Sequence, residues 1–190
     1  RGKPGLMAVG ASGRRFVNEA DSYHDFVVAM HGDRSLPVIP AYLVCDHRFI
    51  RKYGLGLVRP RVSRIAAFVR DGYLIRARSI EELARSAGID PVALRDTVDT
   101  YNADARDGVD SQFGRGSRVL NRHNGDPEHR PNPCMAPIDQ PPYYALPVTP
   151  CTIGTTIGLA ADVDSRVLDK AGAPIPGLYA CGNDISSVFR

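Results

Sequence analysis

The sequence contains no apolar run that approaches the roughly 18 residues of a membrane-spanning helix. Its four cysteines, at positions 45, 134, 151 and 181, include no C-x-x-C spacing. This argues against a zinc site and a disulfide framework, and no metal site is expected. Isolated cysteines in a chain of 190 residues usually act as small buried apolar side chains in a reducing compartment. We therefore expect a cytoplasmic protein without a membrane span.

Lysine is scarce: only Lys3, Lys52 and Lys170 occur among 24 basic residues, and the others are arginines. The formal net charge is +3, and the arginines lie scattered among acidic and apolar residues. A nucleic-acid surface usually shows a dense basic stripe, which is absent here. We therefore expect no nucleic-acid partner.

The remaining composition is ordinary for a globular protein, with 43% hydrophobic and 24% charged residues. A length of 190 residues is enough to bury a core in one domain, or in one and a half. The sequence opens with Arg1 and not with methionine. We therefore expect an internal piece of a longer chain.

The most informative stretch is residues 172–184, GAPIPGLYACGND. Prolines and glycines surround a short apolar run at residues 178–181, which predicts a turn and then a buried strand. Gly182 follows, at a point where the backbone is expected to approach another group closely. Asn183 and Asp184 come next, and an amide beside a carboxylate suits the hydroxyl groups of a ribose or ribityl chain. The stretch therefore predicts one half of a cofactor-binding site.

The N-terminal half mixes short strands and helices. Helices are expected over residues 20–30 and 47–53, and strands over residues 6–9, 14–19, 37–44, 62–70 and 72–75.

Two helices have clear start signals. Ser79 and Glu82 have the spacing of a capping box, and Gly88 ends the helix that they begin. Asp90 is expected to cap the next helix, with Pro91 at its first helical position. Both helices show apolar residues at helical spacing.

The C-terminal half has less regular pattern. Residues 110–142 are rich in glycine and proline and predict a long loop, which is typical of a functional or wrapping segment. Beyond it we expect a strand over residues 143–146, a Gly/Thr-rich turn over 154–158, and a hairpin of residues 166–168 and 175–181.

Three sequence blocks occur in a specific order. They are GRRFVNE at 13–19 with Tyr23 after it, PYYA at 142–145 with IGT at 153–155, and RVLD at 166–169 with PIPGLYA at 174–180 and GN at 182–183. Together they resemble the FAD-dependent oxidoreductases of the fumarate reductase/succinate dehydrogenase flavoprotein type. Within that superfamily the chain looks most like the 3-ketosteroid dehydrogenases. The resemblance covers nearly the whole chain, and the ordered trio is far more specific than any one block.

The resemblance implies an α+β fold. It implies a substrate-cap domain with short β-hairpins and a few helices, plus strands that return to a Rossmann-like FAD domain. No G-x-G-x-x-G occurs in the chain, so we expect the Rossmann-like unit itself to be missing. On this basis residues 1–24 enter from the FAD domain, residues 25–140 form the cap, and residues 141–190 return, truncated, to the FAD domain.

The resemblance also implies that Tyr23 is the catalytic acid/base. In ketosteroid dehydrogenases a tyrosine shortly after the Asn-Glu pair moves a proton at the steroid A ring while flavin N5 handles the hydride. An unperturbed tyrosine has a pKa of about 10, so a neighbouring group must lower the pKa for tyrosine to act as a base. The structural alternative is that Tyr23 only packs under the first helix. Before it, Asn18 and Glu19 are expected to bond backbone or flavin-side groups, or Glu19 to pair with Arg14 or Arg15.

FAD is the implied cofactor of the full-length protein, and we expect it to be absent from this piece alone. Gly182, Asn183 and Asp184 match the Gly-Asn block beside the ribityl chain of the flavin. Gly154 and Thr155 are the other implied cofactor residues, and a plain Gly/Thr turn is the alternative. Fumarate reductases carry a dicarboxylate-binding histidine at the position of Gly154, which disfavours a dicarboxylate substrate here.

The implied substrate is an apolar ketone, in the first instance a steroid. Tyr143 and Tyr144 are expected to line its pocket, although aromatic residues equally serve as plain core. The resemblance implies hydride transfer between a 3-ketosteroid-like substrate and flavin N5. Two alternatives remain: a reductase of another unsaturated carbonyl or carboxylate in the same superfamily, or a fragment that acts only as a non-catalytic binding or assembly module. Open strand edges would allow such a fragment to dimerise.

Overall fold

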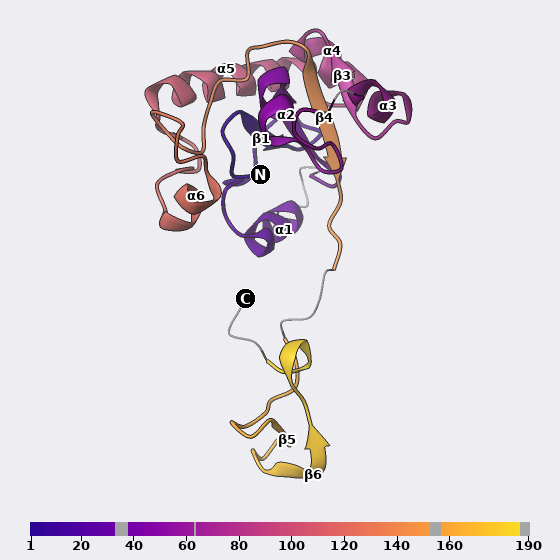
Figure 1. The fold of residues 1–190 in the computed structure, drawn as a ribbon, viewed down its shortest axis with the longest axis vertical. Helices are drawn as coiled ribbons and strands as arrows, with labels where there is room; N and C mark the ends of the chain where they lie inside the picture. Colours follow the sequence, from indigo (N-terminus) through magenta and orange to yellow (C-terminus); the bar gives the residue numbers. More distant parts are fainter. Residues whose placement is uncertain (33–37, 63, 153–156, 187–190) are drawn as a thin grey trace. The chain divides into compact units, whose positions relative to one another are not determined.

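The computed structural model describes residues 1–32, 38–62, 64–152 and 157–186. The chain divides into two compact units, Arg1–Pro150 and Cys151–Arg190 (Figure 1). None of the helices in the described ranges has the length and apolar character that crossing a membrane requires.

The first unit is built on a four-stranded antiparallel sheet. Its strand order is β1 (Leu6–Val9), β2 (Ala41–Asp46), β4 (Tyr143–Val148) and β3 (Ile75–Ala77). Leu6 pairs with Cys45 at one end of the β1–β2 ladder, and Cys45 in turn pairs with Tyr144 of β4. The strands predicted at residues 6–9, 37–44 and 143–146 are therefore confirmed, the second with shifted bounds.

Helices cover both faces of this sheet, because alternate strand residues point to opposite sides. Leu6 and Ala8 belong to one apolar cluster, while Met7 and Val9 belong to another. Figure 1 shows the long helix α5 on one side of the sheet and α1 on the other. The first cluster takes in α1 (Tyr23–Gly32) and α2 (His47–Tyr53), and the second takes in α4 (Ile80–Ala87) and α5 (Pro91–Asp107).

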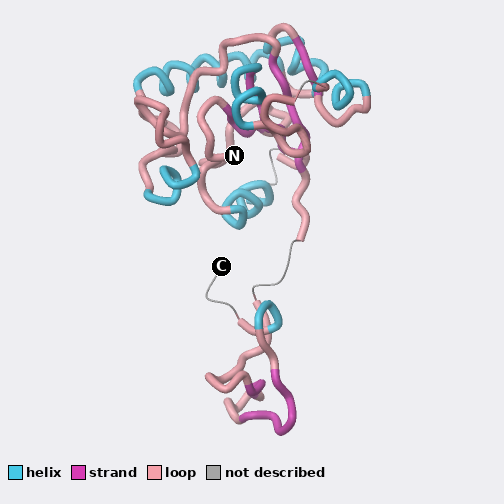
Figure 2. Tube along the Cα trace, viewed as in Figure 1, coloured by secondary structure: helices cyan, strands magenta, loops and turns pink. Residues whose placement is uncertain are grey.

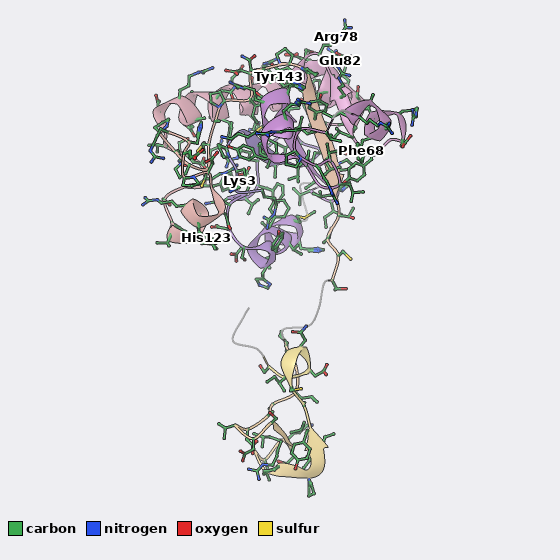
Figure 3. The ribbon with its side chains drawn as sticks, in the orientation of Figure 1. Lys3, Phe68, Arg78, Glu82, His123 and Tyr143 are labelled. Atoms are coloured by element: carbon green, nitrogen blue, oxygen red, sulfur yellow. The ribbon has the colours of Figure 1, made fainter. Side chains whose placement is uncertain are left out.

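Both predicted capping signals are confirmed. The Ser79 hydroxyl accepts a hydrogen bond from the Glu82 backbone N–H at 3.1 Å. The Glu82 carboxylate reaches one residue further back than a capping box requires and accepts from the Arg78 N–H at 2.9 Å; Figure 3 labels both residues. The Asp90 carboxylate accepts from the first two free N–H groups of α5, at 2.9 Å each.

The strand predicted over residues 62–70 is wrong, because α3 (Ile65–Arg70) occupies this stretch. Ile65, Phe68 and Val69 follow the helical spacing i, i+3, i+4 and pack against the first apolar cluster. Their β-branched and aromatic side chains favour strands by composition, but the run is too short for composition to separate the two structures. The strand predicted at residues 72–75 begins later, as β3.

The strand predicted over residues 14–19 is also wrong. Only Arg15 forms a bridge there, with Val9. Arg15 and Glu19 instead form an ion pair at 2.8 Å. In a strand, residues four apart are separated by about 13 Å, so this direct contact requires a folded turn.

The long loop predicted over residues 110–142 contains one short helix, α6 (Val119–Asn124). No side chain caps the start of α6. Val119 and Leu120 are exposed on it, so the usual amphipathic pattern is missing. Most of the remaining segment is irregular, as Figure 2 shows by its loop colour.

The second unit contains the predicted hairpin of β5 (Arg166–Leu168) and β6 (Pro174–Tyr179). Its turn is held by the Asp169 carboxylate, which accepts from the N–H groups of Ala171 and Ala173 at 2.8 and 2.9 Å. The burial predicted for the second strand is wrong for this unit, since every residue of β6 is exposed. Dimerisation through such edges stays a prediction.

The compact units do not follow the boundaries expected from the sequence. One sheet joins β1 from residues 1–24, β2 and β3 from residues 25–140, and β4 from residues 141–190. The observed folding pattern is mixed helix and sheet, as predicted. The division into cap and FAD-domain segments stays a prediction about the whole protein.

Candidate active site beside Tyr23

A buried network of charged side chains lies next to the turn that leads into α1. Arg15 donates to both oxygens of Glu19, at 2.9 and 2.8 Å, and to both oxygens of Asp110, at 2.8 and 3.0 Å. The three side chains are 1% exposed or less. Of the two arginines that the sequence left open as partners of Glu19, the structure selects Arg15.

Arg115 extends this network to the start of the chain. Its guanidinium donates to Glu19 at 3.0 Å and to the Leu6 carbonyl at 2.6 Å. It also donates to the carbonyls of Arg1 and Lys3, each at 2.9 Å. One buried side chain therefore ties three backbone positions of the N-terminal segment to the 13–19 block.

The charges in the network stabilise one another. Burial alone would raise the pKa of Glu19, but the guanidinium groups of Arg15 and Arg115 outweigh burial and hold that pKa below its usual range. Burial likewise acts to raise the pKa of Asp110, and hydrogen bonding and charge from Arg15 hold it low. The pKa of Arg15 is raised, since its two carboxylate partners overcome the effect of burial. All three groups are therefore charged at neutral pH.

A set of amide contacts shapes the turn before α1. Asn18 donates to Asn121 at 3.0 Å, and its carbonyl oxygen accepts from the Ala20 N–H at 3.0 Å. Asn121 donates in turn to Asp21 at 2.8 Å. The backbone that carries Tyr23 is thus held from both sides by buried polar side chains.

Tyr23 is the first residue of α1, and its side chain is 82% exposed in this chain. It borders a pocket of about 370 Å³. The exposure does not fit the alternative in which Tyr23 only packs under the helix. The other charged and apolar side chains that line this pocket are Arg1, Lys3, Glu19, Asp21 and Leu120.

Tyr143 and Tyr144 lie on opposite faces of the sheet. Tyr144 is 2% exposed and belongs to the apolar cluster beneath α1 and α2. Tyr143, labelled in Figure 3, packs against the cluster on the opposite face of the sheet. The two side chains therefore cannot line one pocket together. Their role in substrate binding stays a prediction.

The predicted cofactor residues lie in the second unit or outside the described residues. Gly154 and Thr155 fall among residues 153–156, which the structure does not describe. Gly182, Asn183 and Asp184 form a 3₁₀ turn, and all three are exposed in this unit. Within the described part of the chain, no three His, Cys, Asp or Glu side chains gather as metal ligands would.

A family model described as "FAD binding domain" matches residues 1–190, the whole chain. The chain belongs to the FAD binding domain family. This membership confirms the flavin cofactor and the family of FAD-dependent oxidoreductases that the ordered sequence blocks predicted.

Relatives in this family agree with the resemblance. The chain is 42% identical to the 4-oxocyclohex-2-ene-1-carboxylate 5-dehydrogenase of Sinomonas cyclohexanicum, over 99% of this chain and 32% of that protein. It is 37% identical to the 3-oxosteroid 1-dehydrogenase of Mycobacterium tuberculosis, over 96% of this chain and 34% of that protein. The chain thus spans about a third of the length of the curated relatives it matches.

A solved structure shows the same likeness in three dimensions. The 3-ketosteroid delta1-dehydrogenase of Sterolibacterium denitrificans, in complex with 1,4-androstadiene-3,17-dione, matches with a TM-score of 0.89 and 39% identity. The match covers 97% of this chain and 34% of that protein.

The exposed turn of the second unit fits the flavin cofactor of this family. Gly182 has a φ of +62°, and a Cβ added there would meet no atom within 4 Å. The turn therefore presents accessible backbone next to an amide and a carboxylate, which suits the hydroxyl-rich chain of FAD. The assignment of Gly182, Asn183 and Asp184 to the cofactor site stays a prediction.

Sequence reasoning missed Arg1, which lines the pocket, and Asp110 and Arg115, which belong to the buried network. Asp110 and Arg115 belong to an irregular segment without a periodic signal, and their partners lie far away in the sequence. One local sign was present, since Arg115 stands between Gly114 and Gly116. A Cβ at Gly116 would approach the Asn132 side chain to 2.2 Å, so this loop packs tightly around the arginine.

Proposed function

We propose that this chain is part of an FAD-dependent dehydrogenase that introduces a carbon–carbon double bond beside the ketone of an apolar, steroid-like substrate. The observation that carries the proposal is the likeness to a steroid dehydrogenase across 97% of this chain, with a TM-score of 0.89. The position of Tyr23 beside an open pocket supports it further.

Tyr23 is the acid/base in this proposal. Dehydrogenation beside a ketone removes a proton from the carbon next to the carbonyl and a hydride from the carbon after it. FAD, when bound, supplies the hydride acceptor. Tyr23 would take the proton through its phenol oxygen, which its 82% exposure leaves accessible to a ligand. The buried network at Arg15, Glu19 and Arg115 would hold the surrounding backbone in place.

The cofactor would be held in part by Gly182, Asn183 and Asp184, whose exposed turn was described above. We propose the same role for Gly154 and Thr155, on the sequence resemblance alone. Their task is to bind and orient the cofactor. We also propose a cytoplasmic location, on the ground that all four cysteines are free thiols.

A smaller ketone that carries a carboxylate is the second candidate substrate. Two observations favour it: the relative with 42% identity is named for such a compound, and Arg1 and Lys3 line the pocket beside Tyr23. Glu19 and Asp21 line the same pocket, but Glu19 is paired with Arg15 and Arg115, and Asp21 is paired with Arg118. The uncharged steroid ketone remains our first choice because the likeness in three dimensions, with a TM-score of 0.89 over 97% of this chain, is to a steroid dehydrogenase.

The experiment that tests the proposal is a dye-linked dehydrogenase assay of the FAD-loaded full-length protein with a 3-oxosteroid and with 4-oxocyclohexanecarboxylate. Turnover of the steroid supports the proposal, and turnover of the carboxylate alone selects the second candidate. Tyr23→Phe should lower kcat by at least about a hundredfold with either compound. Tyr42→Phe is the matched control, because Tyr42 packs on the face of the sheet opposite α1 and should retain full activity. Activity with neither ketone would refute the assignment.

A further inference from the structure

We propose that Leu120 is a substrate-contacting residue, which meets the hydrocarbon rings of the ketone in the pocket beside Tyr23. This inference rests on the proposed function, because it takes that pocket as the place of the substrate. The observation that carries it is the 46% exposure of Leu120 in the lining that it shares with Tyr23. The residue would give the site its preference for an apolar ligand.

The short helix α6, which carries Leu120, is apolar where a surface helix is normally polar. Asn121 is fully buried, whereas Val119 and Leu120 are 85% and 46% exposed. An ordinary surface helix turns its apolar side chains toward the core and its polar side chains toward water. The packing of α6 therefore keeps a leucine at the surface, where its side chain is accessible to a ligand.

Polar contacts fix α6 to the turn before α1. The buried amide of Asn121 donates to the Asp21 carboxylate at 2.8 Å, and Arg118 pairs with the same carboxylate at 3.1 Å. At the other end of the helix, Asn124 donates to the Ala20 carbonyl at 3.0 Å. The helix is therefore held against the same turn that leads into the first residue of α1.

The polar side chains that line the pocket already have partners. Glu19 is paired with Arg15 and Arg115, and Lys3 donates to the Gly125 carbonyl at 2.6 Å. The remaining polar side chains of the lining are also hydrogen-bonded: Arg1, Asp21, Ser22 and Asn124. An apolar ligand can therefore cover this lining without taking hydrogen-bond partners away from these groups.

Leu120 differs from the rest of the lining. Among the described residues that border the pocket, it is the one with a purely aliphatic side chain. The cavity of about 370 Å³ lies within the range of small-molecule sites, about 300–1,000 Å³. A fused-ring ketone extends well beyond its reacting carbons, so a ligand held at Tyr23 would fill this cavity and bury part of Leu120. That burial favours an apolar ligand over water.

The test compares Leu120→Asn with Val119→Thr in the FAD-loaded full-length protein. Each substitution replaces an aliphatic side chain with a polar one of similar size, but Val119 is not among the described residues that line the pocket. The ligand is a 3-oxosteroid that already carries the new double bond, so its Kd can be measured by calorimetry without turnover. Leu120→Asn should raise the Kd about tenfold. Val119→Thr should leave it unchanged, and Leu120→Met should keep most of the affinity.

Turnover supplies the second readout. In Leu120→Asn the KM for a 3-oxosteroid substrate should rise while kcat stays close to that of the wild type, because Tyr23 is retained. A wild type that does not bind the steroid, or an unchanged Kd in Leu120→Asn, would overturn the inference. An unchanged Kd with a lower melting temperature would show that another part of the full-length protein covers Leu120. If Leu120→Asn weakens binding but the wild type does not dehydrogenate the steroid, the contact stands and the proposed function fails.

Discussion

Arg15 and Asp110 lie 95 residues apart in the sequence, and two hydrogen bonds of 2.8 and 3.0 Å join their side chains in the interior of the first unit. Both side chains are 1% exposed or less. This pair attaches the irregular segment after α5 to the turn that precedes α1. The geometry around Tyr23 is therefore a long-range product of the fold.

Asp110→Asn should be strongly destabilising. The substitution leaves a buried guanidinium with one of its two carboxylate partners, and breaking a buried pair usually costs about 3–5 kcal/mol. The measurement is the free energy of unfolding by urea. Asp71→Asn is the control, since Asp71 is 63% exposed and should change stability by about 0.5 kcal/mol at most. Equal effects of the two substitutions would show that the buried pair is energetically unimportant.

The stability of the first unit should fall in acid because of Glu19 and Asp110. Their pKa values are lowered in the folded state, so they contribute stability that is present above their unfolded pKa values of about 4.3 and 3.9. That contribution is lost as the pH falls through the lowered values. Urea unfolding measured between about pH 7 and pH 3 should show the loss. Asp110→Asn should flatten the plot of unfolding free energy against pH. A plot as steep as that of the wild type would show that Asp110 does not contribute to the loss of stability in acid.

Gly13→Ala should cost more than Gly72→Ala, although both glycines have nearly the same φ angle. Their φ angles are +73° and +75°, so the cost of the left-handed conformation, about 1–2 kcal/mol, is shared. A Cβ at Gly13 would lie 2.6 Å from the Leu94 nitrogen at the start of α5, whereas a Cβ at Gly72 meets nothing within 4 Å. Thermal unfolding of the two variants isolates the effect of the clash with Leu94. Similar melting temperatures would show that Gly13 does not pack closely against α5.

Ser79→Ala should destabilise α4 by about 1 kcal/mol, because the Glu82 N–H loses its acceptor. Ser86→Ala is the matched control. Ser86 is an exposed residue inside the same helix, where alanine is the better helix former. The free energies of unfolding should therefore change in opposite directions. A loss of stability in Ser86→Ala as large as that in Ser79→Ala would contradict the capping role.

The fold could be predicted where the information is local. Ser79, Asp90 and Pro91 marked two helix starts, and turn residues marked the hairpin of β5 and β6, because caps and turns depend on neighbours in the sequence. Local pattern failed for the strand predicted over residues 62–70, where a short run of β-branched and aromatic residues suits either structure and α3 is formed instead. It also failed at residues 14–19, where Arg15 pairs with Glu19 and with the distant Asp110.

The candidate site was predicted in part, for a different reason. Tyr23 came from the resemblance to a family, whereas Gly182, Asn183 and Asp184 came first from the local pattern of residues 172–184 and then from the resemblance. Arg115 could not be found in this way, since its partners Glu19 and Leu6 lie far from it in the sequence.

In the proposed reaction Tyr23 and FAD act together on the carbons beside a ketone. Anaerobic mixing of the FAD-loaded full-length protein with a 3-oxosteroid, followed by the absorbance of the flavin, tests this joint action. We expect rapid bleaching in the wild type, bleaching at least about a hundredfold slower in Tyr23→Phe, and none with a steroid that lacks the 3-oxo group. Bleaching at the wild-type rate in Tyr23→Phe, or no bleaching by the 3-oxosteroid at all, would contradict it.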